Sequence, residues 1–463
     1  MFVRAEGILE FALTSSKKRA VSNTLNFFTG WSLFNRIEVV MSKRRVVVTG
    51  LGVLSPIGVN LDSYWDALVE GKSGVSYLTS IKTDLPRRPI GSEVPDFKPK
   101  DYIKPKKNVK IMSRDIQMGV VATLLACQNA DLKFDPEQRN TDPERLGCIF
   151  GCDLIGLELD YLKDAFRAGI SAGNYDFSTW GPASMANIMP LWMLKYLPNM
   201  IASHIAIALD ARGPNNTPTL DRGSSLAAFM EACRIIERGA ADVMIAGGAG
   251  NKINPTILSR SGAYDLAPWS ETPDQDPRPF DAERKGAVIG EGAAAFVLES
   301  EDFALARGAK PLAVVKGFAE ALEPTATFGI EQQAIERAIA LALDRAEMKP
   351  EDLGHVNANA FGLESDQKEA AAIANTLGSQ IPVFSATGHF GNLGSGAGAV
   401  ELVASILALH KGMIPPTRNC EHVDPLCQIN VVRKQPQASN VPSFIKLSHA
   451  NTGRSFALIL EKY

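Results

Sequence analysis

The chain has 463 residues, a formal net charge of −3 and 45% hydrophobic residues, so a large core and two or more domains, or one large duplicated fold, are possible. The near-neutral charge argues against a nucleic-acid-binding protein, and no apolar run reaches the length of a membrane span. Six cysteines without paired CxxC spacing argue against a disulfide framework and a structural zinc site, and indicate reduced, mostly buried thiols in a cytoplasmic protein.

The first forty residues differ from the rest of the chain. They are mildly basic and aromatic, and they lack the apolar core and small-residue cleavage site of a signal peptide. Met41 then begins a stretch, MSKRRVVVTGLGVLSPIG, that is typical of a natural protein start. We therefore interpret residues 1–41 as a leader produced by an extended gene model. An N-terminal half over 42–300 and a C-terminal half over 301–463 follow.

Buried strands and amphipathic helices alternate from residue 44 onward. The β-branched run 44–50 predicts a central strand, and a helix with a glycine stop follows within 60–74. An Ala- and Leu-rich pattern predicts a helix over 114–132, and the run 145–156 predicts a strand and a tight turn. The polar and aromatic segment from 157 to about 200 is expected to be an insertion that lies over a surface.

Residues 217–250 have the pattern of a reactive site. An extended run leads into a tight turn, then an amphipathic helix that Gly239 ends, then a buried strand. Asp221 is the expected N-cap of this helix. Such an arrangement presents one reactive side chain at a helix N-terminus, but the turn at 221–225 contains no cysteine.

The second part of the chain repeats this alternation, which predicts an α/β fold with mainly buried strands and indicates an internal duplication. In order, the segments are a loop and strand at 276–300, a linker at 301–311, a strand at 312–322, a helix at 331–347, a strand and turn at 355–366, and a strand and glycine-rich helix at 382–412.

Several long motifs resemble, in order, those of β-ketoacyl-ACP synthase II, the elongating condensing enzyme of fatty-acid and polyketide synthesis. They are VVVTGLGVLSPIG, RIIERGAADVMIAGGA, RPFDAERKGAVIGEGAAAFVLE, GAVELVASILALHKGMIPPTRN and the final ALILEKY. The resemblance runs from about residue 43 to 463. It implies the thiolase fold, an α/β architecture of two similar halves in five layers, αβαβα. It also implies an intimate dimer, partnership with acyl carrier protein (ACP), and no cofactor or metal.

The chemistry of this family is a decarboxylative Claisen condensation. A cysteine at a helix N-terminus takes the acyl chain as a thioester, because the helix dipole and the N–H groups of the turn favour the thiolate and the oxyanion. Two histidines then stabilise the enolate that forms when malonyl-ACP loses CO₂. A lysine supports one of them, and a glycine-rich loop that carries phenylalanine gates the acyl tunnel.

The motif positions of the nucleophile and of both histidines carry other residues. Counting back without gaps from RGAADVMIAGGA places Arg222 at the cysteine position, with Asp221 as the expected compensating charge. The first histidine, of the motif N-A-H-G-T, is Asn359 in NANAFG. The second falls on His389 if ATGH is aligned, or on Asn392 in the gapless register from GAVE. We prefer Asn392, because that register preserves the small-residue helix start.

The supporting lysine and the gate are also replaced. Phe384 or Thr387 stands at the lysine position, and the gating motif N-S-F-G-F-G-G-T-N reads LSHANTGRS at 447–455. The resemblance makes Ser224, Phe384 and Asn451 the expected substrate-binding residues. The residues that keep the family pattern outside the site are Asp281, Arg284 and Glu291.

Other potentially reactive side chains have ordinary structural interpretations. Ser224 and Ser225 lack a GxSxG elbow and are expected to serve the first helical turn. Cys233 is expected in the core, Cys152 near a turn is expected to be structural, and a loop role is preferred for His389. The histidines without a catalytic constellation are His355, His410, His422 and His449.

Three functions remain open. The first, which we favour, is a non-condensing member that pairs with an active paralogue, as chain-length factors do. The second is an active 3-oxoacyl-ACP synthase II with rearranged residues. The third is a non-catalytic homodimer that binds acyl chains or the carrier protein.

Overall fold

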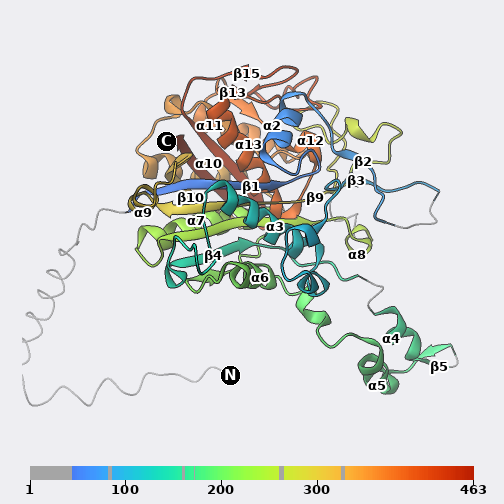
Figure 1. The fold of residues 1–463 in the computed structure, drawn as a ribbon. Helices are drawn as coiled ribbons and strands as arrows, with labels where there is room; N and C mark the ends of the chain where they lie inside the picture. Colours follow the sequence, from blue (N-terminus) through green and yellow to red (C-terminus); the bar gives the residue numbers. More distant parts are fainter. Residues whose placement is uncertain (1–43, 82–85, 159–161, 172, 260–264, 325–328) are drawn as a thin grey trace, which may run out of the picture. The chain divides into compact units, whose positions relative to one another are not determined.

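The computed structural model describes residues 44–463 except 82–85, 159–161, 172, 260–264 and 325–328 (Figure 1). The interpretation of residues 1–41 as a leader therefore lies outside the described residues. No helix among the described residues is long and apolar enough to cross a membrane.

The main sheet has eleven strands in the order β14-β12-β11-β16-β17-β10-β1-β9-β8-β4-β7. The strands of its N-terminal half are β1 (Val46–Leu54), β9 (Glu291–Ser300), β8 (Val243–Asn251), β4 (Leu146–Gly151) and β7 (Asn215–Asn216). Those of its C-terminal half are β10 (Ala313–Leu322), β17 (Arg454–Lys462), β16 (Ser443–Ala450), β11 (His355–Asn357), β12 (Pro382–Phe384) and β14 (Asn430–Val431). The small two-stranded sheets pair β2 (Val75–Tyr77) with β3 (Ile90–Ser92), β5 (Ile170–Ser171) with β6 (Asn174–Tyr175), and β13 (Met413–Ile414) with β15 (Gln437–Ala438).

The two halves of the main sheet have the same strand order and directions. Antiparallel β1–β9 and β9–β8 pairs correspond to antiparallel β10–β17 and β17–β16 pairs. Parallel β8–β4 and β4–β7 pairs correspond to parallel β16–β11 and β11–β12 pairs. The topology thus confirms the internal duplication.

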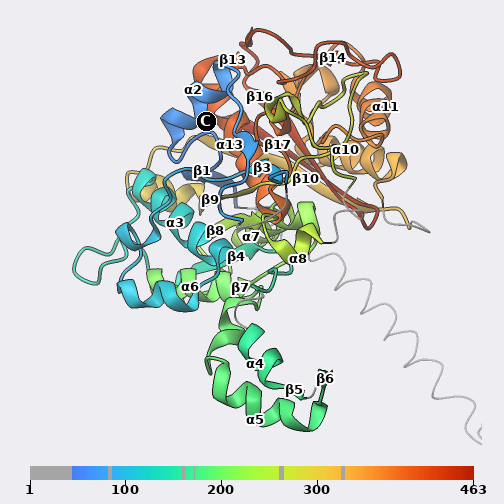
Figure 2. The same ribbon diagram turned by 90° about the vertical axis from the view of Figure 1, so that its right-hand side faces the viewer.

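Helices cover the sheet halves on both faces (Figures 1 and 2). The outer helices of the N-terminal half are α3 (Arg114–Asn129) and α6 (Met200–Leu209), and those of the C-terminal half are α10 (Gln332–Ala346) and α11 (Asp366–Leu377). Between the halves lie α7 (Ser224–Glu237) and α13 (Ala397–Lys411), which contact strands of the sheet and each other. The shorter helices are α2 (Leu61–Val69), α4 (Lys163–Ala168), α5 (Phe177–Asn187), α8 (Pro255–Leu258), α9 (Glu301–Ala306) and α12 (Thr387–Phe390).

Three large hydrophobic clusters fill the space between these layers. On β9, Ala293, Ala295 and Val297 belong to the cluster under α3, whereas Phe296 and Leu298 belong to the central cluster around α7 and α13. A third cluster lies under α10 and α11. Because the strands are buried on both faces, they read as continuous apolar runs rather than as alternating ones. The five-layer αβαβα thiolase-like arrangement is confirmed.

Two segments outside the site differ from the prediction. The segment 301–311 was expected to be a linker, but its first residues form α9. Glu301 and Asp302 in the first turn favour a helix start, and the fully buried Ala304 packs it against the body. A linker prediction missed this because the helix has only six residues.

The expected surface-covering insertion is the second exception. The part that carries α4 and α5 projects away from the body in both views (Figures 1 and 2). Its aromatic side chains pack on one another instead, with ring centroids 4.6 Å apart for Phe166 and Trp180 and 4.9 Å apart for Tyr175 and Phe177. Phe177 and Met185 are 83% and 87% exposed. The segment is therefore an arm whose aromatic side chains contact one another without being buried; α5 has no buried residue.

Candidate functional site

The turn before α7 is built differently from the prediction. Asp221 begins a 3₁₀ turn, Asp221–Gly223, with a φ of 49°, and Gly223 rather than Asp221 is the N-cap residue of α7. The Ser224 hydroxyl donates to the Asp221 carbonyl at 2.6 Å and accepts from the Leu220 N–H at 2.8 Å. A Cβ on Gly223 would lie 2.4 Å from the Phe456 ring, so the turn packs directly on β17.

Arg222 lies in this turn and is 5% exposed. Its Nη2 donates a hydrogen bond to Oδ1 of Asn451, and its guanidinium carbon lies 4.4 Å from the centroid of the Phe361 ring. Asp221 Oδ2 lies 3.7 Å from Arg222 Nε, and Oδ1 of the same carboxylate lies 3.5 Å from Lys252 Nζ. The predicted compensation of Arg222 by Asp221 is thus present, although Asp221 is shared between two cations.

Two hydrogen bonds hold Asn359 next to this turn. Its Oδ1 accepts from the His449 N–H at 3.1 Å, and its own N–H donates to Glu369 Oε1 at 2.7 Å. His449 Nε2 lies 3.2 Å from the same Glu369 oxygen. The Asn359 Nδ2 is buried and has no hydrogen-bond partner among the described residues. His449, which the sequence assigned a structural or surface role, thus fixes the orientation of Asn359 through its backbone N–H.

A buried ion pair supports the strand that leads to Asn359. Lys446 on β16 and Glu401 on α13 form a salt bridge in which both side chains are 0% exposed. Lys446 Nζ also donates to Asn357 Oδ1 at 3.1 Å and to the Ala358 carbonyl at 3.2 Å. The sequence signal was a lysine between the apolar residues of the run Phe444–Leu447, which the motif comparison did not use.

The two candidates for the second histidine position lie in different surroundings. His389 was expected in a loop, but it lies in the short helix α12. It is fully buried, with Nδ1 2.9 Å from the Lys72 carbonyl oxygen and Nε2 3.2 Å from that of Pro416. Burial lowers the pKa of His389 to about 4, so the ring is neutral near pH 7. Asn392, in contrast, lines the same cavity as Arg222.

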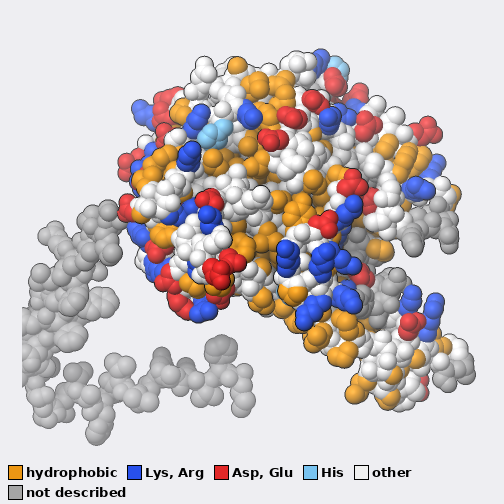
Figure 3. Space-filling view, viewed as in Figure 1, with side chains coloured by type: hydrophobic (Ala, Val, Ile, Leu, Met, Phe, Trp, Pro, Cys, Tyr) orange, Lys and Arg blue, Asp and Glu red, His pale blue; other side chains and the backbone are white. Residues whose placement is uncertain are grey.

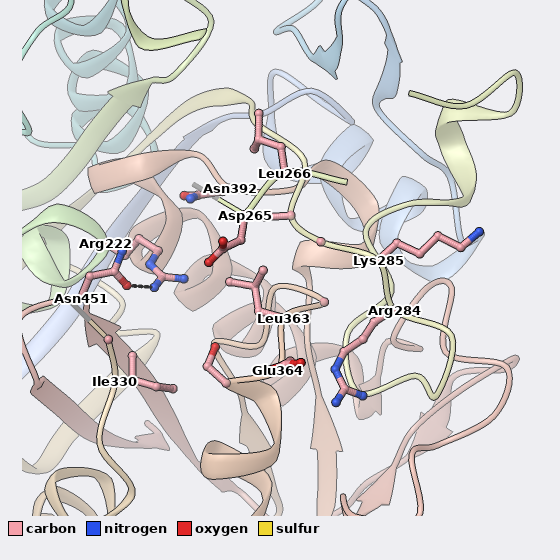
Figure 4. A pocket seen from close by; sticks show the side chains of 15 residues that line it. Arg222, Asp265, Leu266, Arg284, Lys285, Ile330, Leu363, Glu364, Asn392 and Asn451 are labelled. Atoms are coloured by element: carbon pink, nitrogen blue, oxygen red, sulfur yellow. Dashed lines mark hydrogen bonds between the residues drawn. The ribbon is translucent and has the colours of Figure 1, made fainter. Parts of the chain in front are cut away.

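That cavity has a volume of about 590 Å³ (Figure 4). Arg222, Asn392 and Asn451 come from three separate segments and lie toward one end of it. Leu266, Ile330 and Leu363 supply apolar wall. The charged side chains that also line it include Asp265, Lys285 and Glu364.

Other predicted residues lie outside the cavity lining. Phe384 is a fully buried member of the central core, and Ser224 is buried in the turn. The Thr387 hydroxyl bonds the Ala360 carbonyl. Cys152 and Cys233 are buried, and burial raises the pKa of both thiols well above the usual value. All six cysteines are free and buried, as predicted.

The residues that keep the family pattern hold loops around the site. Asp281 Oδ2 accepts from the His422 N–H at 2.7 Å, and Arg284 Nη1 bonds Asp424 Oδ2 at 2.6 Å. Glu291 pairs with Arg114 at 2.6 Å. These contacts fix backbone segments rather than offer reactive groups.

Comparison with known proteins decides the family. Residues 43–304 match the model of the β-ketoacyl synthase N-terminal domain, and residues 312–421 match that of its C-terminal domain. The chain belongs to the β-ketoacyl synthase family. One relative, 3-oxoacyl-[acyl-carrier-protein] synthase 2 of Synechocystis sp., is 32% identical over 433 residues, which cover 91% of the chain and 99% of the relative.

Solved synthase structures share the whole fold. The ishigamide ketosynthase/chain length factor is 28% identical with a TM-score of 0.79, and the match covers 91% of this chain and 100% of that one. A type II polyketide ketosynthase bound to the hexaketide and in complex with its acyl-carrier protein is 25% identical, with a TM-score of 0.77 and the same coverage. Both are structures to which this β-ketoacyl synthase family member is similar.

Proposed function

We propose that this β-ketoacyl synthase family protein does not condense acyl chains by itself and acts as a chain-length-factor-like partner of an active paralogue. The carrying observation is the buried Arg222 in the turn before α7, bonded to Asn451 and stacked on Phe361. A guanidinium stays protonated and cannot form a thioester. The acyl-transfer step thus has no nucleophile at the position that the motif register assigns to it.

The same motif register also leaves the condensation step without its two histidines. Asn359 uses its oxygen to accept from the His449 N–H, and an amide nitrogen does not exchange a proton near pH 7 as an imidazole does. Asn392 accepts from the Gly394 N–H at 2.9 Å with its Oδ1. The two amides can donate hydrogen bonds, but they cannot act as general acids or bases.

The segment just before α3 in the sequence forms a basic surface to which the carrier protein would bind. Figure 3 shows a group of Lys and Arg side chains over this part of the molecule. The exposed lysines of this segment are Lys98, Lys100, Lys104, Lys106, Lys107 and Lys110. Their ammonium groups form no ion pair or hydrogen bond with the described part of the chain. Such a lysine patch favours a negatively charged partner, and ACP with its phosphopantetheine phosphate fits.

The proposed function is tested by assays of malonyl-ACP decarboxylation and acyl condensation. The purified protein is assayed alone, its nearest cysteine-bearing paralogue alone, and the two after co-purification. Condensation that needs the mixture, together with a stable heterodimer, supports the proposal. Condensation by the protein alone contradicts it and favours an active synthase with rearranged residues.

The lysine patch has its own test in the same system. Charge reversal of Lys106 and Lys107 to Glu should weaken ACP binding at least tenfold, because like charges then face an acidic partner. Reversal of Lys316, which lies on β10 and pairs with Glu461 at 2.9 Å, is the control. If the affinity for ACP changes neither with the charge reversal nor with salt concentration, the lysine patch is not the ACP-binding surface.

A further inference from the structure

Arg222 has hydrogen-bond donors that none of the described residues accepts. A guanidinium carries five N–H donors, and the described residues accept one of them, at Asn451. The side chain is 6% exposed, and Nε has no hydrogen-bond partner within the described part of the chain. Buried polar groups are ordinarily bonded, so a buried cation with spare donors is unusual. In Figure 4 the guanidinium extends into the cavity.

The surroundings of Arg222 restrict how a ligand can reach it. The guanidinium carbon lies over the Phe361 ring, 4.4 Å from its centroid, so an apolar ring covers part of the group. The free N–H groups point outward in the guanidinium plane, where a ligand can reach them. Asn392 uses Oδ1 to accept from Gly394, which leaves its amide N–H groups as further donors at the same end. A fork of parallel N–H groups matches the two oxygens of a carboxylate.

The local charge balance favours one negative charge over several. Arg222 and Lys252 are the cations of a cluster whose anions are Asp221 and Asp153, the latter 2.5 Å from Lys252 Nζ. The cluster has no surplus positive charge with which to hold a phosphate dianion. A monoanion can still gain charge-assisted hydrogen bonds to Arg222. The rest of the lining carries two cations, Arg284 and Lys285, and two carboxylates, Asp265 and Glu364, so it adds no net positive charge. Asp265 is exposed, so water screens its repulsion.

We propose that the Arg222 cavity binds the carboxylate of a small molecule with a short apolar body. Arg222 and Asn392 would hold the carboxylate, and Leu266, Ile330 and Leu363 would contact the apolar part. The volume of about 590 Å³ is that of a small-molecule site. This site goes beyond the proposed function, because it belongs to the chain alone and does not require a partner. The carboxylate can come from a free carboxylic acid or from the end of a carboxyacyl thioester.

Calorimetric titration of the full chain tests the proposal. Hexanoate should bind, and hexanamide, which has the same shape without the charge, should bind at least about tenfold more weakly. Malonyl-pantetheine and acetyl-pantetheine form the second matched pair. Hexanoate binding with no difference between the thioesters identifies the free acid as the source. If malonyl-pantetheine binds more tightly than acetyl-pantetheine and hexanoate does not bind, the source is a carboxyacyl thioester. If hexanoate binds as well, the site accepts both sources.

Variants locate the site. Arg222→Gln should weaken carboxylate binding at least about tenfold, and Arg222→Lys should restore part of it. Arg238→Gln removes the same charge from an exposed position at the other end of α7 and should have no effect. Asn451→Asp is nearly isosteric and places a carboxylate beside Arg222, so the new side chain should compete with the ligand and weaken its binding. This variant keeps the test available if Arg222→Gln does not fold. Three results would overturn the proposal. They are equal binding of the charged and uncharged member in both pairs, no binding of hexanoate or malonyl-pantetheine, and full binding by Asn451→Asp.

Discussion

Removal of the Lys446 ammonium isolates the energetics of the buried ion pair that supports the site. In Lys446→Met the side chain keeps its volume, but Glu401 loses its salt-bridge partner while remaining 0% exposed. The other carboxylate oxygen of Glu401, Oε1, already has no hydrogen-bond partner among the described residues. The Asn357 and Ala358 oxygens lose a donor as well.

The expected cost follows from these contacts. Breaking a buried pair by removing one partner destabilises proteins by about 3–5 kcal/mol, because it leaves an uncompensated charge. An unfolding entropy of about 2.1 cal/mol/K per residue gives roughly 1 kcal/mol/K for a chain of 463 residues. Lys446→Met should therefore lower the melting temperature by about 3–5 °C.

Differential scanning calorimetry at pH 7 measures this effect with two comparisons. The double variant Lys446→Met/Glu401→Gln removes both charges and should recover at least half of the loss. Lys316→Met breaks the half-exposed pair with Glu461 and should change the melting temperature by less than about 1 °C. A single variant within about 1 °C of the wild type, or a double variant as unstable as the single one, would refute the reasoning.

Three further predictions concern reactive and titratable groups. Arg222→Cys alone should leave condensation at background, because Asn359 and Asn392 do not replace two histidines; product formation approaching that of an active paralogue would contradict the site assignment. His389 has a folded pKa of about 4 against 6.5 for an ordinary histidine, so its contribution to stability is complete above pH 6.5 and is lost as the pH falls toward 4. The melting temperature of His389→Gln should accordingly vary less with pH across this window than that of the wild type, and identical profiles would count against it. Iodoacetamide at pH 8 should label none of the six buried thiols before unfolding, as mass spectrometry can verify, and rapid native labelling would show that one is accessible.

The amino-acid sequence by itself determined the elements and their order. Apolar runs such as that of β1 need burial on both faces, and periodic helices such as α3 and α10 need one buried face, so local pattern predicts them. Repetition of this alternation also gave the duplicated fold. The turn before α7, with Arg222 in it, was located by the same reasoning, because the helix and strand that follow have strong patterns.

Only the tertiary structure decided what surrounds Arg222. Asn451 lies 229 positions away in the sequence, and no local pattern predicts that its amide meets the guanidinium. The surroundings of His389 and Asn392 differ in the same way, since two carbonyls from distant segments hold the histidine and the cavity takes the asparagine. The Lys446–Glu401 pair joins β16 to α13. Such contacts depend on how the two sheet halves and the helices between them pack, and this packing is a property of the whole chain.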